Sequence, residues 1–255
     1  MMISLTRYLA YRSSFILIVL APSIVAFFIK YHLWLSIYND HPTGQINGYD
    51  LHEMISYHVW ALIISLIAHG HSSMDLAMEI RHGKISSYLI YPFNFWEFHT
   101  AAFLAFEMIQ IVTALITIGI VSMIGAIDLP SLQLLCLGFA YCMLVSFFWF
   151  TLQFLAGLCA FWLEDTWTLR VLAQIIVIFL SGSIIPLEFF PSWLKEILDY
   201  TPFPFMTYYP IKLFMGESIP WVGGILILSI WTTVIMGLNG LIWRKGIRTY
   251  TAAGM

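Results

Sequence analysis

The chain has 255 residues, of which 60% are hydrophobic and only 10% are charged, and its formal net charge is −3. Together with a mean hydropathy of +0.86, this composition excludes an ordinary soluble domain and indicates a membrane protein. So small a net charge gives no reason to expect a nucleic-acid partner.

Six apolar runs are long enough to be membrane spans. A helix rises about 1.5 Å per residue, so about 20 residues cross a hydrocarbon core of about 30 Å. The runs occupy approximately residues 14–37, 54–71, 101–126, 131–163, 169–186 and 221–243. The fourth is longer than the core is thick, which predicts a strong tilt or a projection into water. We therefore expect an all-α membrane protein with six transmembrane helices in a single transmembrane domain, residues 1–255.

The distribution of basic residues predicts the orientation. If the N-terminus is cytoplasmic, eight of the eleven Lys and Arg residues are also cytoplasmic, and only Lys30, Lys195 and Lys212 are not. The positive-inside rule therefore predicts that both termini are cytoplasmic. We interpret Lys30, near the outer end of the first span, as a residue that snorkels to the lipid head groups.

The connection between the second and third spans, residues 73–92, is unusually rich in charge for this chain. Leu76 and Ile80 lie four residues apart, and Gly83 stands where a left-handed C-cap would end a short helix. The charged residues around them are Asp75, Glu79, Arg81 and Lys84. A short amphipathic cytoplasmic helix either lies on the head groups or docks into a groove of a partner protein, and periodicity alone favours neither.

Residues 187–216 form a second distinctive segment, on the predicted outer side. An apolar pattern with helical spacing, at Phe190, Trp193, Leu194, Ile197 and Leu198, predicts an amphipathic helix. Several prolines interrupt the backbone around it: Pro186, Pro191, Pro202 and Pro210. At membrane depth such breaks are tolerated only where protein or water satisfies the backbone. We therefore expect a helical hairpin that re-enters the outer leaflet.

Polar residues also occur inside the third predicted span. Glu107, Gln110, Thr113 and Thr117 are spaced by three, three and four residues, so they share one helix face. They either line a translocation pathway or form hydrogen bonds between helices, for instance at a dimer seam. The position of Glu107, close to the cytoplasmic start of its helix, favours packing or interfacial exposure.

Histidines around the second span raise an alternative function. Buried histidines would suit a histidine-ligated membrane cytochrome or a metal-transport subunit. However, His69 and His71 point to different helix faces, and His58 and His69 lie near opposite ends of one span. Three cysteines, Cys136, Cys142 and Cys159, lack C-x-x-C spacing. The sequence therefore predicts no metal site and no cofactor bound by this chain.

The sequence lacks the phosphate-binding loop of ATP-hydrolysing proteins. The sequence contains no G-x-x-x-x-G-K-[ST] motif, so we do not expect it to bind or hydrolyse ATP itself. The small residues of LSGS, 180–183, are better explained by close helix packing.

Two segments carry a resemblance to a known family. DLAMEIRHGKISSYLIYPFNFW, residues 75–96, resembles the E-I-R-x-G-x-x-x-x-Y-L-x-x-P segment of bacterial ABC-2 type transporter permeases. Residues 181–217 are similar to the outer-face signature of that family, in which S-G-x-x-x-P is followed by P-x-W-L, P-F and Y-x-P. The resemblance covers roughly residues 72–217.

This resemblance implies a type V exporter-like fold with a cytoplasmic coupling helix and an outer re-entrant hairpin. The coupling helix would press into a cleft of an ABC ATP-binding subunit, with Leu76 and Ile80 supplying a small buried contact and the charges orienting it. The residues implied in coupling are Asp75, Leu76, Glu79, Ile80, Arg81, Gly83 and Lys84, and those implied in the hairpin are Pro186, Pro191, Trp193, Pro202 and Pro210.

The implied assembly is a non-catalytic exporter permease of the bacterial inner membrane. It would pair with a second permease, identical or homologous, and with two copies of the ATP-binding subunit, which bind ATP and Mg. Its cargo would be a drug, lipid, peptide or glycoconjugate.

Overall fold

The computed structural model describes residues 12–40, 44–68, 74–88 and 95–250, with side chains described from residue 25 onward except at 74, 75 and 87. Within these residues the regular elements are helices, apart from an isolated β-bridge between Ile46 and Tyr49. The elements are α2 (Arg12–Asn39), α3 (Leu51–Ala68), α4 (Met74–Arg81), α5 (Ile85–Tyr88), α6 (Phe95–Met123), α7 (Leu132–Leu158), η1 (Cys159–Phe161), α8 (Trp167–Leu180), η2 (Leu187–Phe189), α9 (Ser192–Leu198), α10 (Phe203–Met206), α11 (Tyr208–Phe214) and α12 (Trp221–Thr249).

The protein is a multi-pass membrane protein. Among the described residues, four helical segments are long and apolar enough to cross a membrane: α3, α6, α7 with η1, and α12. The helix α2 adds 28 residues over the first predicted span.

The fifth predicted span, residues 169–186, differs from the expectation of a full crossing. The helix α8 has 14 residues, which at about 1.5 Å per residue is about 21 Å, less than the thickness of a bilayer core. It ends at Leu180 because Gly182 adopts a left-handed conformation, with φ of +79°, and Pro186 follows in an extended conformation. Six spanning helices therefore stay a prediction.

Local sequence explains where the helices begin and end. Asp50 and Glu53 form a reciprocal capping box at the start of α3, since each side chain accepts a hydrogen bond from the other residue's backbone N–H, at 2.7 and 2.9 Å. At the end of α4, Gly83 has φ of +73°. The N–H of Gly83 bonds the Ile80 carbonyl and the N–H of Lys84 bonds the Glu79 carbonyl, which is the Schellman pattern. The predicted left-handed C-cap at Gly83 is confirmed.

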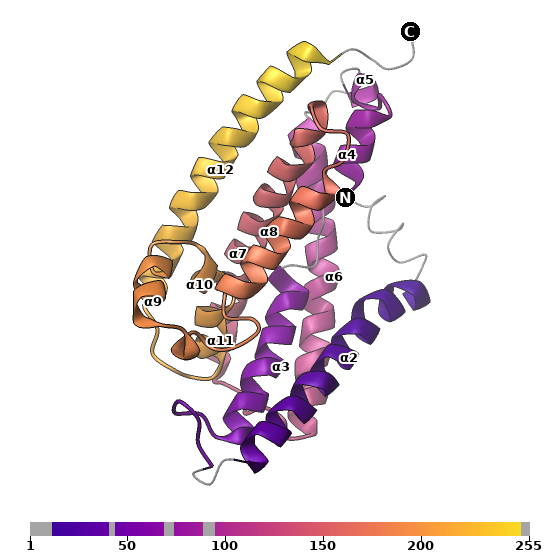
Figure 1. Cartoon of the computed structure of the whole chain (residues 1–255). Helices are drawn as coiled ribbons and strands as arrows, with labels where there is room; N and C mark the ends of the chain where they lie inside the picture. Colours follow the sequence, from indigo (N-terminus) through magenta and orange to yellow (C-terminus); the bar gives the residue numbers. More distant parts are fainter. Residues whose placement is uncertain (1–11, 41–43, 69–73, 89–94, 251–255) are drawn as a thin grey trace.

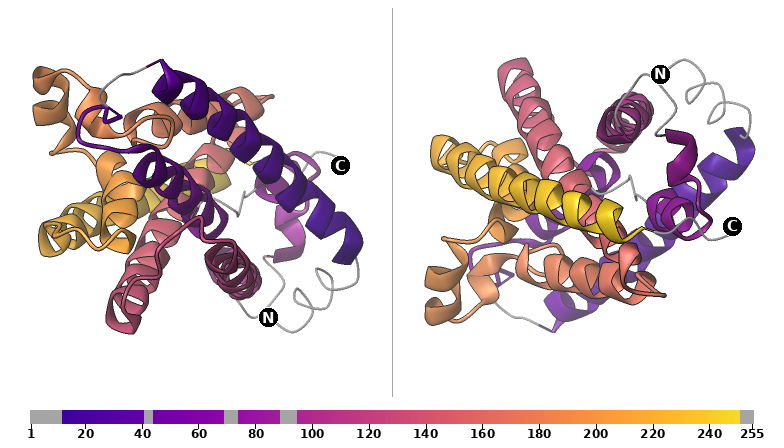
Figure 2. Two further views of the ribbon diagram at one scale, coloured as in Figure 1. Left: turned by 90° about the horizontal axis from the view of Figure 1, so that it is seen from below. Right: turned by 90° about the horizontal axis from the view of Figure 1, so that it is seen from above.

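The helices α3 and α7 form the centre of the bundle. Helix α12 packs along α7, and α3 contacts α2, α6, α7 and α11. Helices α4 and α5 lie at the same end as the last turn of α12, while residues 44–50 lie at the opposite end (Figure 1). The two further views place α2 and α12 on different sides of the bundle (Figure 2).

Two aromatic-rich clusters fill the interior. The larger one includes Trp60 of α3 stacked on Phe214 of α11, with ring centroids 4.6 Å apart. The smaller one lies under α4, where Leu76 and Ile80 pack with Phe154 of α7. The folded-back segment η2–α11 is thus anchored to the first cluster, and α4 to the second.

Candidate functional site

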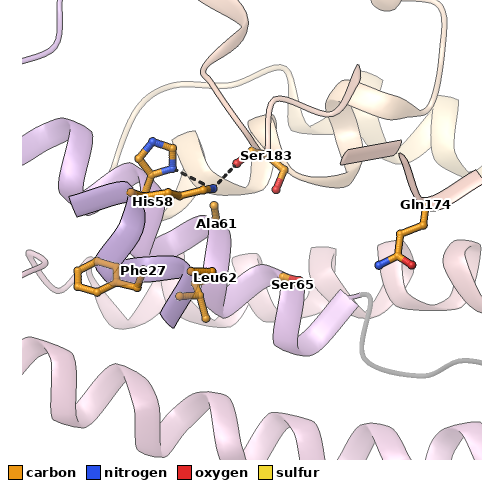
Figure 3. Close-up of a pocket in the computed structure, with 9 residues that line it drawn as sticks. Phe27, His58, Ala61, Leu62, Ser65, Gln174 and Ser183 are labelled. Atoms are coloured by element: carbon orange, nitrogen blue, oxygen red, sulfur yellow. Dashed lines mark hydrogen bonds between the residues drawn. The ribbon is translucent and has the colours of Figure 1, made fainter. Parts of the chain in front are cut away.

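A cavity of about 400 Å³ lies between α2, α3, α8 and the turn after α8. Its lining residues are Ala26, Phe27, Lys30, His58, Ala61, Leu62, Ser65, Gln174 and Ser183. In the close-up, His58 and Ser183 lie near each other and Gln174 lies well away from both (Figure 3). The cavity therefore has a polar corner and apolar walls.

Lys30 supplies the positive charge of that corner. Its Nζ donates a hydrogen bond to the Ser183 carbonyl at 2.9 Å and lies 3.4 Å from His58 Nδ1, and these are the dashed lines in Figure 3. Lys30 is about 13 Å from the end of α2 at Asn39. The expectation that Lys30 snorkels to the head groups is wrong, because its side chain turns toward His58 of α3 and Ser183 in the turn after α8.

The partner of His58 fixes its tautomer. Trp34 Nε1 lies 2.6 Å from His58 Nε2, and an indole N–H can only donate a hydrogen bond. Nε2 must therefore accept, so His58 is neutral and carries its hydrogen on Nδ1, the nitrogen that faces Lys30. A charged Lys30 and the Nδ1–H of His58 are then two donors side by side.

The turn after α8, residues 181–183, is called here the α8 turn, and each of its three carbonyls accepts a bond from a different element. The N–H of Tyr208 on α11 donates to Ser181 at 3.0 Å. The hydroxyl of Tyr57 on α3 donates to Gly182 at 2.6 Å, and Lys30 on α2 donates to Ser183. A side chain at position 182 would place its Cβ 3.1 Å from both the Tyr57 hydroxyl and Tyr208 Cβ. The turn therefore requires glycine.

A second charged group, the Glu188–Lys212 cluster, joins the folded-back segment to the loop before α3. Glu188 Oε1 accepts from the hydroxyls of Tyr208 at 2.7 Å and Tyr49 at 3.1 Å. Lys212 Nζ lies 3.0 Å from the same oxygen and 2.8 Å from Glu217 Oε1, and 4.5 Å from the centre of the Tyr49 ring. Burial alone would raise the pKa of Glu188, but the Tyr208 hydrogen bond and the Lys212 charge outweigh it and lower that pKa.

The predicted hairpin residues occupy three helix starts, one buried position in α11 and one exposed position in α9. Pro186, Pro191 and Pro202 are the N-cap residues of η2, α9 and α10, and Pro210 is buried in α11. Trp193 is 61% exposed. Because α11 packs on α3 and α7, the segment folds back against the bundle. Its insertion into the outer leaflet stays a prediction.

The four polar residues on one face of α6 have two kinds of hydrogen-bond partner. Glu107 and Gln110 bond to neighbouring helices, whereas Thr113 and Thr117 bond to the backbone of α6 itself. Ser146 of α7 donates to Glu107 Oε2 at 2.7 Å, and Gln110 donates to the Leu66 carbonyl of α3 at 2.6 Å. Thr113 and Thr117 bond carbonyls four residues earlier in α6. These contacts favour the helix-packing interpretation over a pathway lining.

The coupling segment is arranged differently from what the resemblance implied. Leu76 and Ile80 are buried inside the chain, 0% and 4% exposed, and Leu76 lies against Gly157 of α7. Glu79 faces inward too, since it accepts from the Tyr88 hydroxyl at 3.0 Å and lies 3.2 Å from His99 Nε2. These three residues therefore seat α4 on the bundle and do not present a surface to a partner. The Asp75 side chain lies outside the described part of the structure.

Other residues of the coupling segment face outward. Met78 is 49% exposed, and His82 and Lys84 are exposed as well. Arg81 is exposed, with its Nη2 3.9 Å from Asp165 Oδ1. A basic surface with one apolar side chain is thus available at this end of the bundle.

The histidine alternative gains nothing from the geometry. Within the described residues, no three His, Cys, Asp or Glu side chains form a group that could hold a metal ion. His58 already uses Nε2 for Trp34, and His69 and His71 lie outside the described residues.

Comparison with protein families decides the assignment. The family model of the ABC-2 family transporter proteins matches residues 24–254. The chain belongs to the ABC-2 transporter family. No curated protein and no solved structure matches it significantly. The two segments that first indicated this family, 75–96 and 181–217, both lie within the match, and membership supports a non-catalytic ABC permease subunit.

Sequence reasoning missed the Lys30 cavity and the Glu188–Lys212 cluster. The signals were a lone lysine inside an apolar run, and the S-G-x-x-x-P motif, which contributes the α8 turn and immediately precedes Leu187 and Glu188. Neither signal indicates which residues contact Lys30 or Glu188, because those residues lie far away in the sequence.

Proposed function

We propose that this chain is the permease subunit of an ATP-driven ABC-2 type exporter in the bacterial inner membrane. The observation that carries the proposal is the family match over residues 24–254. The exporter contains two permeases, identical or homologous, and two ATP-binding subunits that bind ATP and Mg and perform the hydrolysis. Both termini of this chain face the cytoplasm, as the basic residues predict.

The exposed side of α4 and of the turn that follows it supports a docking role for the coupling segment. Met78, Arg81, His82 and Lys84 form the surface that an ATP-binding subunit contacts. On the inner side, Leu76 packs on α7 and Glu79 lies against His99 of α6. A push on α4 is therefore passed to α6 and α7 through packed side chains and not through a loose loop.

Charge reversal in detergent tests the docking role. We expect Arg81→Glu and Lys84→Glu each to lower retention of the permease on a tagged ATP-binding subunit severalfold, because attraction becomes repulsion at a partly desolvated contact. Lys245→Glu is the matched control, since it reverses an exposed basic residue of α12 and should not change retention. Full retention by both the Arg81→Glu and the Lys84→Glu variants would refute the docking surface.

Thiol labelling tests the orientation. After replacement of Cys136, Cys142 and Cys159, single cysteines at Ser192 and Asp199, both exposed on α9 or at its end, should react from outside the cell with an impermeant reagent. Reaction only from the cytoplasmic side would contradict the predicted topology.

A further inference from the structure

We propose that the cavity around Lys30 binds the anionic head group of an amphiphile, a carboxylate or phosphate, whose apolar part lies along α2 and α8. As a binding site the proposal depends only on the cavity. As a statement about the transported cargo it rests on the proposed function.

The charge of Lys30 lacks a counter-ion within the described residues, where no carboxylate lies within 4.0 Å of its Nζ; its two close polar neighbours are the Ser183 carbonyl and His58. Taking an ammonium group out of water without a paired anion is costly. A cation inside a membrane span therefore indicates a ligand or pathway, and its natural partner is an anion.

The donors in the polar corner outnumber the acceptors. The Lys30 ammonium gives one hydrogen bond to Ser183 and keeps further donor hydrogens, and the Nδ1–H of His58 lies 3.4 Å away. Two neighbouring donors cannot satisfy each other. An oxygen of a carboxylate or phosphate within reach of both accepts from both, with charge-assisted bonds that are stronger than neutral ones.

Size and surroundings specify the rest of the ligand. A cavity of about 400 Å³ is at the small end of ligand pockets, which span about 300–1,000 Å³, so it holds a head group but no long chain. Phe27 and Leu62 form apolar walls. Large apolar side chains are also exposed on other faces of the two flanking helices: Phe28 and Ile29 on α2, and Ile175, Ile176 and Phe179 on α8. An acyl chain that leaves the cavity past Phe27 and Leu62 therefore meets apolar helix surface.

Binding to the purified full-length permease, without the ATP-binding subunit, tests the site. The probes are a lysophosphatidic acid and a fatty acid, each against a monoacylglycerol of the same chain length, measured by native mass spectrometry from a neutral detergent. Anionic probes should bind and the neutral probe should not. Lys30→Met should weaken anionic binding at least about tenfold, the value of a hydrogen bond to a charged group, while Lys30→Arg should retain it.

Two controls test whether any loss of binding is specific to Lys30. Lys195→Met removes a lysine of α9 and should leave binding unchanged, and thermal unfolding of Lys30→Met shows whether that variant is folded. Equal binding of anionic and neutral probes, or unchanged anionic binding by folded Lys30→Met, would overturn the proposal. Inorganic phosphate that binds as tightly as the amphiphiles would overturn its apolar half.

A second arm distinguishes cargo from membrane lipid. In the complex with the ATP-binding subunit, stimulation of ATP hydrolysis by the anionic probe, lost in Lys30→Met, identifies the ligand as cargo. Binding without stimulation identifies a lipid head group. Because binding is measured on the permease alone, failure of the exporter assignment and failure of the site give different results.

Discussion

The Glu188–Lys212 cluster gives the sharpest test of how the folded-back segment is held. The Lys212 side chain is 7% exposed, while those of Glu188 and Glu217 are 30% and 49% exposed. Lys212→Met removes the cation and leaves two carboxylates close together. Breaking a fully buried ion pair costs about 3–5 kcal/mol.

The expected cost here is smaller for two structural reasons. Both carboxylates are partly solvated, and Glu188 keeps the hydroxyl donors of Tyr49 and Tyr208. We therefore expect Lys212→Met to lower the free energy of unfolding by about 2 kcal/mol. For a chain of this size that corresponds to about 4–8 °C in Tm.

A double-mutant cycle separates the ion pair from lost packing. Glu188→Gln alone should cost about 1 kcal/mol, because the amide carbonyl still accepts from the two tyrosines. The double variant should be more stable than the sum of the single losses by about 1–2 kcal/mol. Thermal unfolding in detergent, followed by tryptophan fluorescence, measures each variant, and the exposed Glu196→Gln on α9 is the matched control, expected within about 0.5 kcal/mol of the parent. Strictly additive losses would refute a coupled pair.

Three further tests use single features of the structure. The pKa of Glu188 is lowered in the folded protein, so ionised Glu188 stabilises the fold fully at a pH above the ordinary carboxyl pKa. This stabilisation is lost as the pH falls through the lowered pKa of the folded state. Glu188→Gln should therefore reduce the fall in Tm that acid causes. Gly182→Ala should cost about 1–2 kcal/mol in unfolding free energy, because φ is +79° there, and a Tm equal to the parent's would contradict this. Gly157→Val should displace α4 and lower ATPase stimulation by the permease without a change of charge, because an added Cβ would lie 2.6 Å from Leu76 Cδ2 and 3.2 Å from Arg170 Nη2; normal stimulation would count against α4 as the transmitting element.

Features set by neighbouring residues could be predicted from the sequence. The short helix α4 and its end at Gly83 follow from an apolar spacing and a glycine, both local, and the structure has both. The positions of the long helices follow from apolar length alone. The predicted fifth span extends to Pro186, whereas α8 ends at Leu180 because Gly182 breaks the helix.

Features set by contacts between helices could not be predicted. Amphipathic spacing showed that one face of α4 is apolar, but not that this face packs on α7 of the same chain, leaving Met78 and Arg81 outside. Lys30 illustrates the same limit: near a predicted helix end, snorkelling and inward bonding look identical in sequence. The difference is made by Ser183, more than 150 residues later.

The α8 turn connects Lys30 of the cavity with the Glu188–Lys212 cluster. Ser183 holds Lys30 beside the cavity, and Ser181 holds the first residue of α11, Tyr208, whose hydroxyl bonds Glu188. Between them, Gly182 has no side chain and accepts from Tyr57 of the central helix α3. A ligand that draws Lys30 away from Ser183 would release one of three bonds that hold this turn, while the cluster around Glu188 anchors the other side. The short, broken form of α8 is thus what allows three carbonyls to point at three different elements, which a continuous helix, with its carbonyls bonded within itself, could not do.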